Sequence, residues 1–483
     1  MRKTGLVLLA YFYLLQLYGQ DSVRVQQDTV ILSLKNVINM TLSFHPIVKK
    51  AELFSQDAAA NLRMARGQLD PKVELDYDVK NFKETEYFDL LTTTFKVPTW
   101  IGIDPKVEFI RNEGDNNGQF LNDQNSIPED DGFKQLHLGL AVPLGKGLFF
   151  DERRNIIKQA EGFTQIAEAE RIKATNKILL TVIKDYWEWY VSYQQLILLT
   201  QAIDLSQDLF NRTIIDYEFG EAAVVDTLQA KINLQKRTVD FRKAQADFEV
   251  ARLNLGKHLW SKDLVPLEIQ SSVIPDANSL FRTPAEESLK SDIEFALENH
   301  PEISKLEGKR NQLDAGLRWA RESLKPEFDL SYSFINAPIN QDFESETLDF
   351  GENYKLGLDF SFPIFLRKER GKLQQTKLKI QSNEFEMANS QLEIKNDVIS
   401  IYTRSIAFED LLGQYAGVSD NYRLLLEAEI INLQNGETDL FKLNIQQDKY
   451  IEAQNDYYDA LIKWEKSKAE YNYTIGVPFL GLQ

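Results

Sequence analysis

The residues best suited to chemistry are four histidines and a large number of carboxylates. The histidines are His45, His137, His258 and His300. A metal site or an acid–base pair needs such groups at short, regular spacing, as in the His-Glu-x-x-His pattern, and these four form no such cluster. His45 and His300 each precede a proline, which a helix tolerates in its first turn, so we expect both to cap or pack helices. No phosphate-binding loop or nucleophile-elbow pattern occurs either, so we expect neither catalysis nor a cofactor.

A polar segment at about residues 98–132 is rich in Asp, Asn, Gly and Pro. Such a composition is typical of an exposed, variable loop. Carboxylate and carbonyl oxygens suit calcium, but their spacing here matches no EF-hand pattern. Calcium in this loop is therefore an alternative to a plain surface loop, and no metal site is predicted.

Composition restricts where the protein can work. The 483 residues carry a net charge of −18, which argues against binding nucleic acid. A basic start and a short apolar run predict a secretory signal over residues 1–19. Cysteine is absent, and no other apolar stretch is long enough for a transmembrane helix. An exported chain of this kind can enter a membrane only through β-strands.

The sequence contains two copies of one structural repeat. A histidine opens each copy, and a proline follows the helix that this histidine begins. The two histidines lie 300 − 45 = 255 residues apart, and the two prolines also lie 326 − 71 = 255 residues apart. Pro143 and Pro363 lie 363 − 143 = 220 residues apart, and Gly256 and Gly476 lie 476 − 256 = 220 residues apart. Because this offset is smaller than 255, the first copy has extra residues between its two strands. We assign residues 20–256 to the first repeat, 257–299 to a connector or equatorial segment, and 300–483 to the second repeat.

Four segments alternate apolar and polar residues with period two, which predicts strands at about 72–82, 134–143, 327–335 and 353–363. A soluble half-buried sheet shows this pattern, and so does a membrane barrel. Four strands cannot close a barrel, and open edges cannot lie in lipid. The membrane interpretation therefore requires several chains that share one barrel.

A long helical pattern follows each strand pair, with no proline at 144–264 or 364–477. Within each helical segment, a glycine gives the only strong turn signal. We therefore expect helical hairpins at 144–256 and 364–476, with tips at Gly220 and Gly436. Apolar residues recur at spacings of three and four, as in a coiled-coil seam. The seam residues are Leu179, Ile183, Tyr186, Tyr190, Tyr193 and Ile197, and in the second copy Leu411, Tyr415, Val418, Tyr422 and Leu425.

The order of these features resembles the TolC family of outer-membrane efflux proteins. The matching pieces are the two His-Pro pairs, Pro71 and Pro326 before the first strands, Val142-Pro143 and Phe362-Pro363 after the second, the tip Phe219-Gly220-Glu221, and Gly256 and Gly476 at the helix ends. The resemblance implies a mainly α fold with a β-barrel portion: a duplicated unit of helix, strand pair and long helical hairpin. Three chains would form a trimeric 12-stranded barrel and an α-helical periplasmic tube.

The resemblance also implies partners and a working end. It implies a homotrimer in outer-membrane lipid of a Gram-negative bacterium, a periplasmic adaptor (membrane fusion protein) and an inner-membrane transporter. The tips would dock the adaptor and constrict the pore, through Gly220, Glu221, Asp226, Gly436, Glu437, Asp439 and Lys442. Asp226 lies where well-known members place a gate aspartate, but Lys442 occupies the equivalent position of the second copy and Ile445 replaces another pore acid. Leu433 and Thr438 replace the residues that latch the gate in some members, so we expect a different latch and no acidic ring.

Two classes of function follow. The first is a passive outer-membrane duct of a tripartite efflux or type I secretion system, opened by its adaptor and pump. The second is a soluble periplasmic coiled-coil scaffold or adaptor whose sheets cap long helices. Recovery in outer-membrane fractions separates them. Asp226 has two interpretations as well: a pore-facing acid, or a solvated acid favoured by a helix N-terminus.

Overall fold

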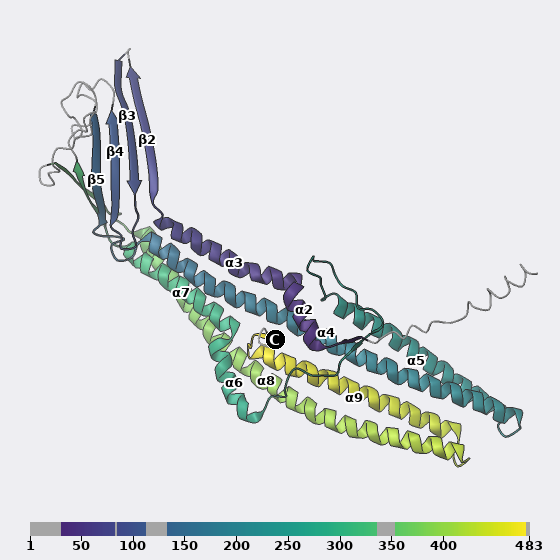
Figure 1. The fold of residues 1–483 in the computed structure, drawn as a ribbon. Helices are drawn as coiled ribbons and strands as arrows, with labels where there is room; N and C mark the ends of the chain where they lie inside the picture. The colour runs from purple at the N-terminus through teal and green to yellow at the C-terminus, as the bar shows by residue number, and fades with distance from the viewer. Residues whose placement is uncertain (1–29, 83–84, 113–132, 336–352, 480–483) are drawn as a thin grey trace, which may run out of the picture. The chain divides into compact units, whose positions relative to one another are not determined.

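The computed structural model describes residues 30–82, 85–112, 133–335 and 353–479, and it forms two compact units (Figure 1). Of the described residues, the first unit comprises 30–41, 182–281 and 412–465, and the second comprises those of 42–181, 282–411 and 466–479. The predicted signal at 1–19 and residues 113–132 of the predicted polar loop lie outside the described residues.

Helices make up most of the described chain. They are α2 (Leu34–Phe44), α3 (Pro46–Arg66), α4 (Glu152–Glu218), α5 (Val224–Gly256), α6 (Glu286–Asn299), α7 (Pro301–Glu322), α8 (Arg367–Gln434) and α9 (Leu440–Thr474), with a 3-10 turn η1 (Gly67–Leu69). The mainly α fold class with a strand portion is confirmed. None of the helices within the described residues is both long and apolar enough to cross a membrane.

Equivalent helices in the two copies begin with the same cap. The His45 Nδ1 accepts a hydrogen bond from the Ile47 backbone N–H at 3.1 Å, and the His300 Nδ1 accepts one from Glu302 N–H at 3.1 Å. A proline follows each histidine at the first helical position, where its missing N–H costs nothing. The capping role predicted for both histidines is confirmed.

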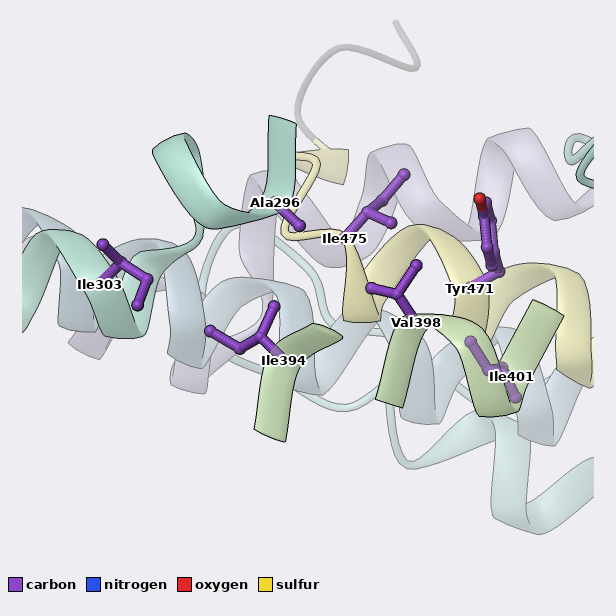
Figure 2. Packing of buried hydrophobic residues seen from close by; sticks show 7 residues of the cluster. All are labelled: Ala296, Ile303, Ile394, Val398, Ile401, Tyr471 and Ile475. Carbon is purple, nitrogen blue, oxygen red and sulfur yellow. The ribbon is translucent and has the colours of Figure 1, made fainter. Parts of the chain in front are cut away.

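In the second unit, apolar residues of α6, α7, α8 and α9 converge on one cluster (Figure 2). Its members are Ala296, Ile303, Ile394, Val398, Ile401, Tyr471 and Ile475. The Tyr471 hydroxyl reaches the Asp292 carboxylate at 2.7 Å, so the polar end of this buried ring has a partner.

In the first unit, the two helical hairpins pack against each other. One cluster joins Leu198, Leu199 and Ala202 of α4 to Ala244 of α5 and Ile451 of α9. A second cluster, nearer the turns, joins Leu209 of α4, Leu426 of α8 and Leu443 of α9. A short parallel pair of strands, β1 (Val30–Leu32) and β6 (Val273–Pro275), completes this unit.

The two predicted seams differ in burial. Leu179, Ile183 and Tyr186 of the first seam are fully buried. Leu411, Val418 and Leu425 of the second seam are 40%, 44% and 43% exposed. The stripe of the second copy therefore faces outward in the single chain, whereas part of the first copy's stripe is buried within it.

The second unit contains one antiparallel sheet of six strands, in the order β2-β3-β4-β5-β7-β8. The strands are β2 (Lys72–Phe82), β3 (Thr85–Lys96), β4 (Asp104–Asn112), β5 (Phe133–Pro143), β7 (Glu327–Ile335) and β8 (Tyr354–Ser361). Figure 1 shows β2 to β5 side by side. The strands β2 and β8 form the two edges of this sheet.

The number of strands corrects the sequence analysis. The strands β2, β5, β7 and β8 lie in the four segments with predicted alternation, but β3 and β4 were not predicted. The predicted irregular loop at 98–132 is wrong for residues 104–112, which form β4. The run Thr92-Thr93-Thr94 hides the alternation of β3, and Pro105 discourages the assignment of a strand to β4.

The register gives the sheet one apolar and one polar face. Cross-strand partners lie on the same face, so a row of partners can be followed through all six strands. One row is Val73, Phe95, Val107, Leu138, Phe334 and Tyr354. The adjacent row, on the opposite face, is Lys72, Lys96, Lys106, Gly139, Ser333 and Lys355.

Candidate functional site

Each helical hairpin reverses at a glycine in the left-handed region. Gly220 has φ 79° and Gly436 has φ 76°. In the first turn, Gly220 N–H donates to the Tyr217 carbonyl at 3.0 Å and Glu221 N–H donates to the Asp216 carbonyl at 2.8 Å. This paired pattern satisfies the last carbonyls of a helix and requires a positive φ, which glycine adopts without strain.

The second turn repeats this geometry. Gly436 N–H donates to the Leu433 carbonyl at 3.1 Å, and Glu437 N–H donates to the Asn432 carbonyl at 2.9 Å. Two copies of one turn therefore end α4 and α8. They are the two tips of the first unit.

The helices that leave the tips are capped by different carboxylates. The Asp226 carboxylate accepts a hydrogen bond from the Ala223 backbone N–H at 2.9 Å, so it caps α5 from inside the helix. The Asp439 carboxylate accepts one from the Lys442 N–H at 2.8 Å, so it caps α9 from the preceding position. The positive N-terminal end of the helix dipole also stabilises both carboxylates.

A carboxylate that sequence analysis missed holds the second tip together. Glu429 of α8 is 3% exposed, and its Oε1 accepts a hydrogen bond from the Thr438 hydroxyl. The Lys442 ammonium lies 3.3 Å from the same oxygen. The hydrogen bond from Thr438, with the ammonium of Lys442, holds the pKa of Glu429 below its ordinary value of 4.5. Thr438 and Lys442, which depart from the family pattern, thus share one partner.

A groove of about 660 Å³ lies between the two tips. Its walls come from the end of α4, the residues after Gly220, and the second turn. Four of the predicted site residues line it, namely Glu221, Asp226, Gly436 and Asp439. Gly220, Glu437 and Lys442 do not line it: the two former belong to the turns, and Lys442 lies in the first turn of α9.

The groove has an acidic lining, and the tips that form it also expose apolar side chains. Asp216 joins Glu221, Asp226 and Asp439 in its lining, against the single cation Arg212 among the lining residues. Exposed apolar residues of the tips are Phe219 (79%), Val224 (62%), Val225 (69%), Leu228 (56%) and Phe441 (62%). Apolar groups gathered at such exposure are typical of a docking surface for another protein.

Further along the same helices, buried polar groups join the two hairpins. The Asn233 amide of α5 donates to Asn444 of α9 at 2.7 Å, and the Gln447 amide of α9 donates to the Ala202 carbonyl of α4 at 3.1 Å. Asn233 and Gln447 are 9% and 2% exposed. No local pattern in the sequence marks these residues, because their partners lie on other helices.

A larger hollow, of about 800 Å³, lies in the second unit between the sheet and the helices α4, α7 and α8. Its lining mixes lysines with glutamates, among them Lys146, Lys372, Glu152 and Glu327. No group of three or more metal-binding side chains occurs among the described residues. We therefore take the tip groove as the candidate site.

The comparisons with known proteins agree with this architecture. Residues 125–259 match the family model of outer membrane efflux proteins. No curated protein matches the sequence. Among solved structures, the CmeC outer membrane channel of Campylobacter jejuni is similar at 14% identity and a TM-score of 0.62, over 92% of this chain and 85% of that chain.

Two further structures give the same result. VceC of Vibrio cholerae has 13% identity and a TM-score of 0.60, over 92% of this chain and 96% of that one. The open state of MtrE of Neisseria gonorrhoeae has 15% identity and a TM-score of 0.58, over 92% and 88%. The helical hairpins and amphipathic sheet therefore have the fold of outer-membrane channels. The match to the outer membrane efflux protein model covers residues 125–259, and the fold of these channels extends over most of the chain.

Proposed function

We propose that this chain is the outer-membrane duct of a tripartite efflux or type I secretion system. The apolar face of the six-stranded sheet carries this proposal. Many of its side chains are largely exposed, which is costly in water and favourable in lipid. They include Val73 (69%), Leu75 (64%), Leu140 (46%), Leu356 (60%), Leu358 (58%) and Phe360 (66%).

The opposite face of the sheet suits an aqueous interior. It presents Glu74 and Asp76 of β2, Lys106 of β4, and Lys355 and Asp359 of β8. In a transmembrane sheet, apolar side chains face lipid and polar side chains face the lumen. A soluble scaffold, the alternative, has no use for an exposed apolar face of this extent.

Two surfaces that the described residues of a single chain leave open support a homotrimer. The sheet has free edges at β2 and β8, and free edges cannot lie in lipid. Exposed apolar residues also recur on α8 at intervals of seven, which is the spacing of a coiled-coil contact. They are Leu378 (58%), Phe385 (67%), Leu392 (57%), Ile399 (38%) and Ile406 (37%). Packing of further copies along this stripe and these edges would cover both.

The tip groove is the proposed docking site for a periplasmic adaptor, which in turn meets an inner-membrane transporter. Its acidic lining and apolar surroundings suit a hairpin with basic and apolar side chains. The relatives are channels, and we assign no reaction to this chain. Energy for export would come from the transporter.

The first test is purification from detergent-solubilised membranes, with mass measurement and single-particle imaging. A three-fold tube in the outer-membrane fraction is expected. The 67 residues of α4 alone span about 100 Å at about 1.5 Å per residue, so the tube should be at least that long. A monomer in the soluble periplasm would support the scaffold instead.

The docking site has its own test. Gly220→Pro removes an N–H that donates at 3.0 Å and forbids the positive φ, so docking and export should be lost while the trimer persists. Gly436→Pro should act alike. Glu286→Pro is the matched control, because Glu286 is the first residue of α6, follows an extended Ala285 and does not belong to the tips. Full export by both glycine variants would refute the tip assignment.

A further inference from the structure

The two strands that sequence analysis missed form a hairpin inserted between β2 and β5. The ladder between β3 and β4 runs from the pair Leu90–Asn112 to the pair Lys96–Lys106. On the other side, β4 pairs with β5 from Asp104–Ala141 to Asn112–Phe133. The hairpin is therefore a continuous part of the sheet and separates strands that would otherwise be neighbours.

Next to its turn, over residues 92–96 and 105–109, the hairpin keeps the two faces of the sheet distinct. Phe95 and Val107 lie in the apolar row between Val73 and Leu138. On the other face, Thr94 pairs with Glu74 and with Glu108. A flap lying in water has no need for such a division, whereas a strand between lipid and lumen requires it.

The start of β4, next to the turn of the hairpin, is tied to the first turn of α4. Asp104 is 8% exposed and accepts two hydrogen bonds from the Arg153 Nη1, at 3.0 and 3.1 Å. The Asp104 carboxylate also accepts the Thr99 N–H at 3.0 Å, which closes the turn. Arg153 in turn donates to Asp151 at 2.9 Å. These contacts hold the hairpin in the plane of the sheet.

We propose that the β3–β4 hairpin is part of the pore wall, so that each chain contributes six strands to it. This proposal rests on the homotrimeric duct proposed above. Six strands from each of three chains make an eighteen-stranded wall, whereas four would make twelve. The diameter of a closed sheet grows roughly with its number of strands. The membrane segment is then wider than four strands per chain would allow, and Thr92, Thr94, Lys106 and Glu108 line its lumen.

The native chain has no cysteine, so single cysteines test this wall directly. The run Thr92-Thr93-Thr94 supplies a matched set, because alternate residues of a strand face opposite sides. In trimers reconstituted into lipid vesicles, a charged, membrane-impermeant thiol reagent should label Thr92→Cys and Thr94→Cys at least about tenfold faster than Thr93→Cys. A fluorophore attached at position 93 before reconstitution should be quenched by brominated lipid, and one at 92 or 94 should not.

Equal labelling at all three positions would show that water reaches both faces, and the hairpin would then be a flap outside the wall. Labelling at none would equally overturn the proposal.

Control positions on β7 separate the hairpin from the duct. Ser331 belongs to the polar face and Leu330 to the apolar face, and neither touches the inserted strands. Ser331→Cys should be labelled and Leu330→Cys should not. If this pair behaves as expected while positions 92 and 94 do not react, the result supports the proposed duct and refutes the proposal that each chain contributes six strands to its wall. If Ser331→Cys is also unreactive, the duct itself is refuted.

Discussion

At the scale of single residues, the tips depend on glycine for its backbone and not for its size. An added Cβ at Gly436 would meet no atom within 4 Å, so only the positive φ of 76° resists substitution. Gly413, inside α8, also has open space around its Cα but no positive φ. The two positions therefore separate backbone strain from steric contact.

Gly436→Ala should destabilise the tip by about 1 kcal/mol, because alanine is strained in the left-handed region. Gly413→Ala should stabilise α8 by about 0.5–1 kcal/mol, because alanine loses less backbone entropy in a helix. Hydrogen exchange of the amides in α8 measures both opening free energies. Equal effects of the same sign would contradict this account.

The Glu429 carboxylate should make the second tip sensitive to acid. Its pKa in the folded chain lies below its ordinary value of 4.5, since Thr438 and Lys442 favour the ionised form. The carboxylate therefore stabilises the tip above the unfolded pKa, and this contribution is lost as pH falls through the folded pKa. Protection of the Thr438 and Lys442 amides from exchange should decline in that range. In Glu429→Gln, protection should be lower at neutral pH and should lack this decline.

At the scale of elements, a nearly buried arginine joins the two hairpins. Arg237 of α5 is 2% exposed, and its guanidinium donates to the Asp448 carboxylate of α9. The Lys236 ammonium lies 2.9 Å from the same carboxylate. Partial burial of Asp448 raises its pKa, but the hydrogen bonds from Lys236 and Arg237 outweigh this effect and lower it. The contact thus couples α5 to α9 through charge.

Asp448→Asn should destabilise the contact between α5 and α9 by about 1 kcal/mol, because the nearly buried guanidinium keeps only Asp240, 3.5 Å from its Nη1, as a counter-charge, while water screens the half-exposed Asp448. Replacing Arg237 by Met in that background should recover most of the loss, since no buried charge is left unpaired. The melting temperature of the detergent-solubilised protein measures both variants. A double variant no more stable than Asp448→Asn would mean that Arg237 acts through packing alone.

At the scale of the whole molecule, the exposed apolar stripe on α8 is the proposed contact between copies of the chain. Phe385, at its centre, is 67% exposed in one chain. Phe385→Asp should abolish the proposed trimer, because a charge buried between helices costs several kcal/mol. Gln391→Asp, an exposed position outside the stripe, is the control. Light scattering of the purified protein decides the matter, and trimeric Phe385→Asp would show that α8 is not the interface.

Much of the architecture could be read from the sequence. The duplicated histidine–proline starts predicted two equivalent helix caps, and His45 and His300 form them with the same atom. Gly220 and Gly436 marked both turns, because no other residue type so readily takes a positive φ. These features were readable because each rests on a residue and its immediate neighbours.

Only the tertiary structure revealed the six-stranded sheet, the outward-facing seam of the second copy, and Glu429. The strand β3 carries threonines on both faces, and threonine suits lipid and water alike, so its alternation is invisible until its partners are known. Leu411 and Val418 follow the same spacing as the buried seam, and spacing states which residues share a stripe but not what covers it. Glu429 lies nine residues before Thr438, and the turn at Gly436 alone brings them together. Short segments of sequence determine local conformation, whereas the burial of a side chain and its hydrogen-bond partners depend on which segments pack together in the folded chain.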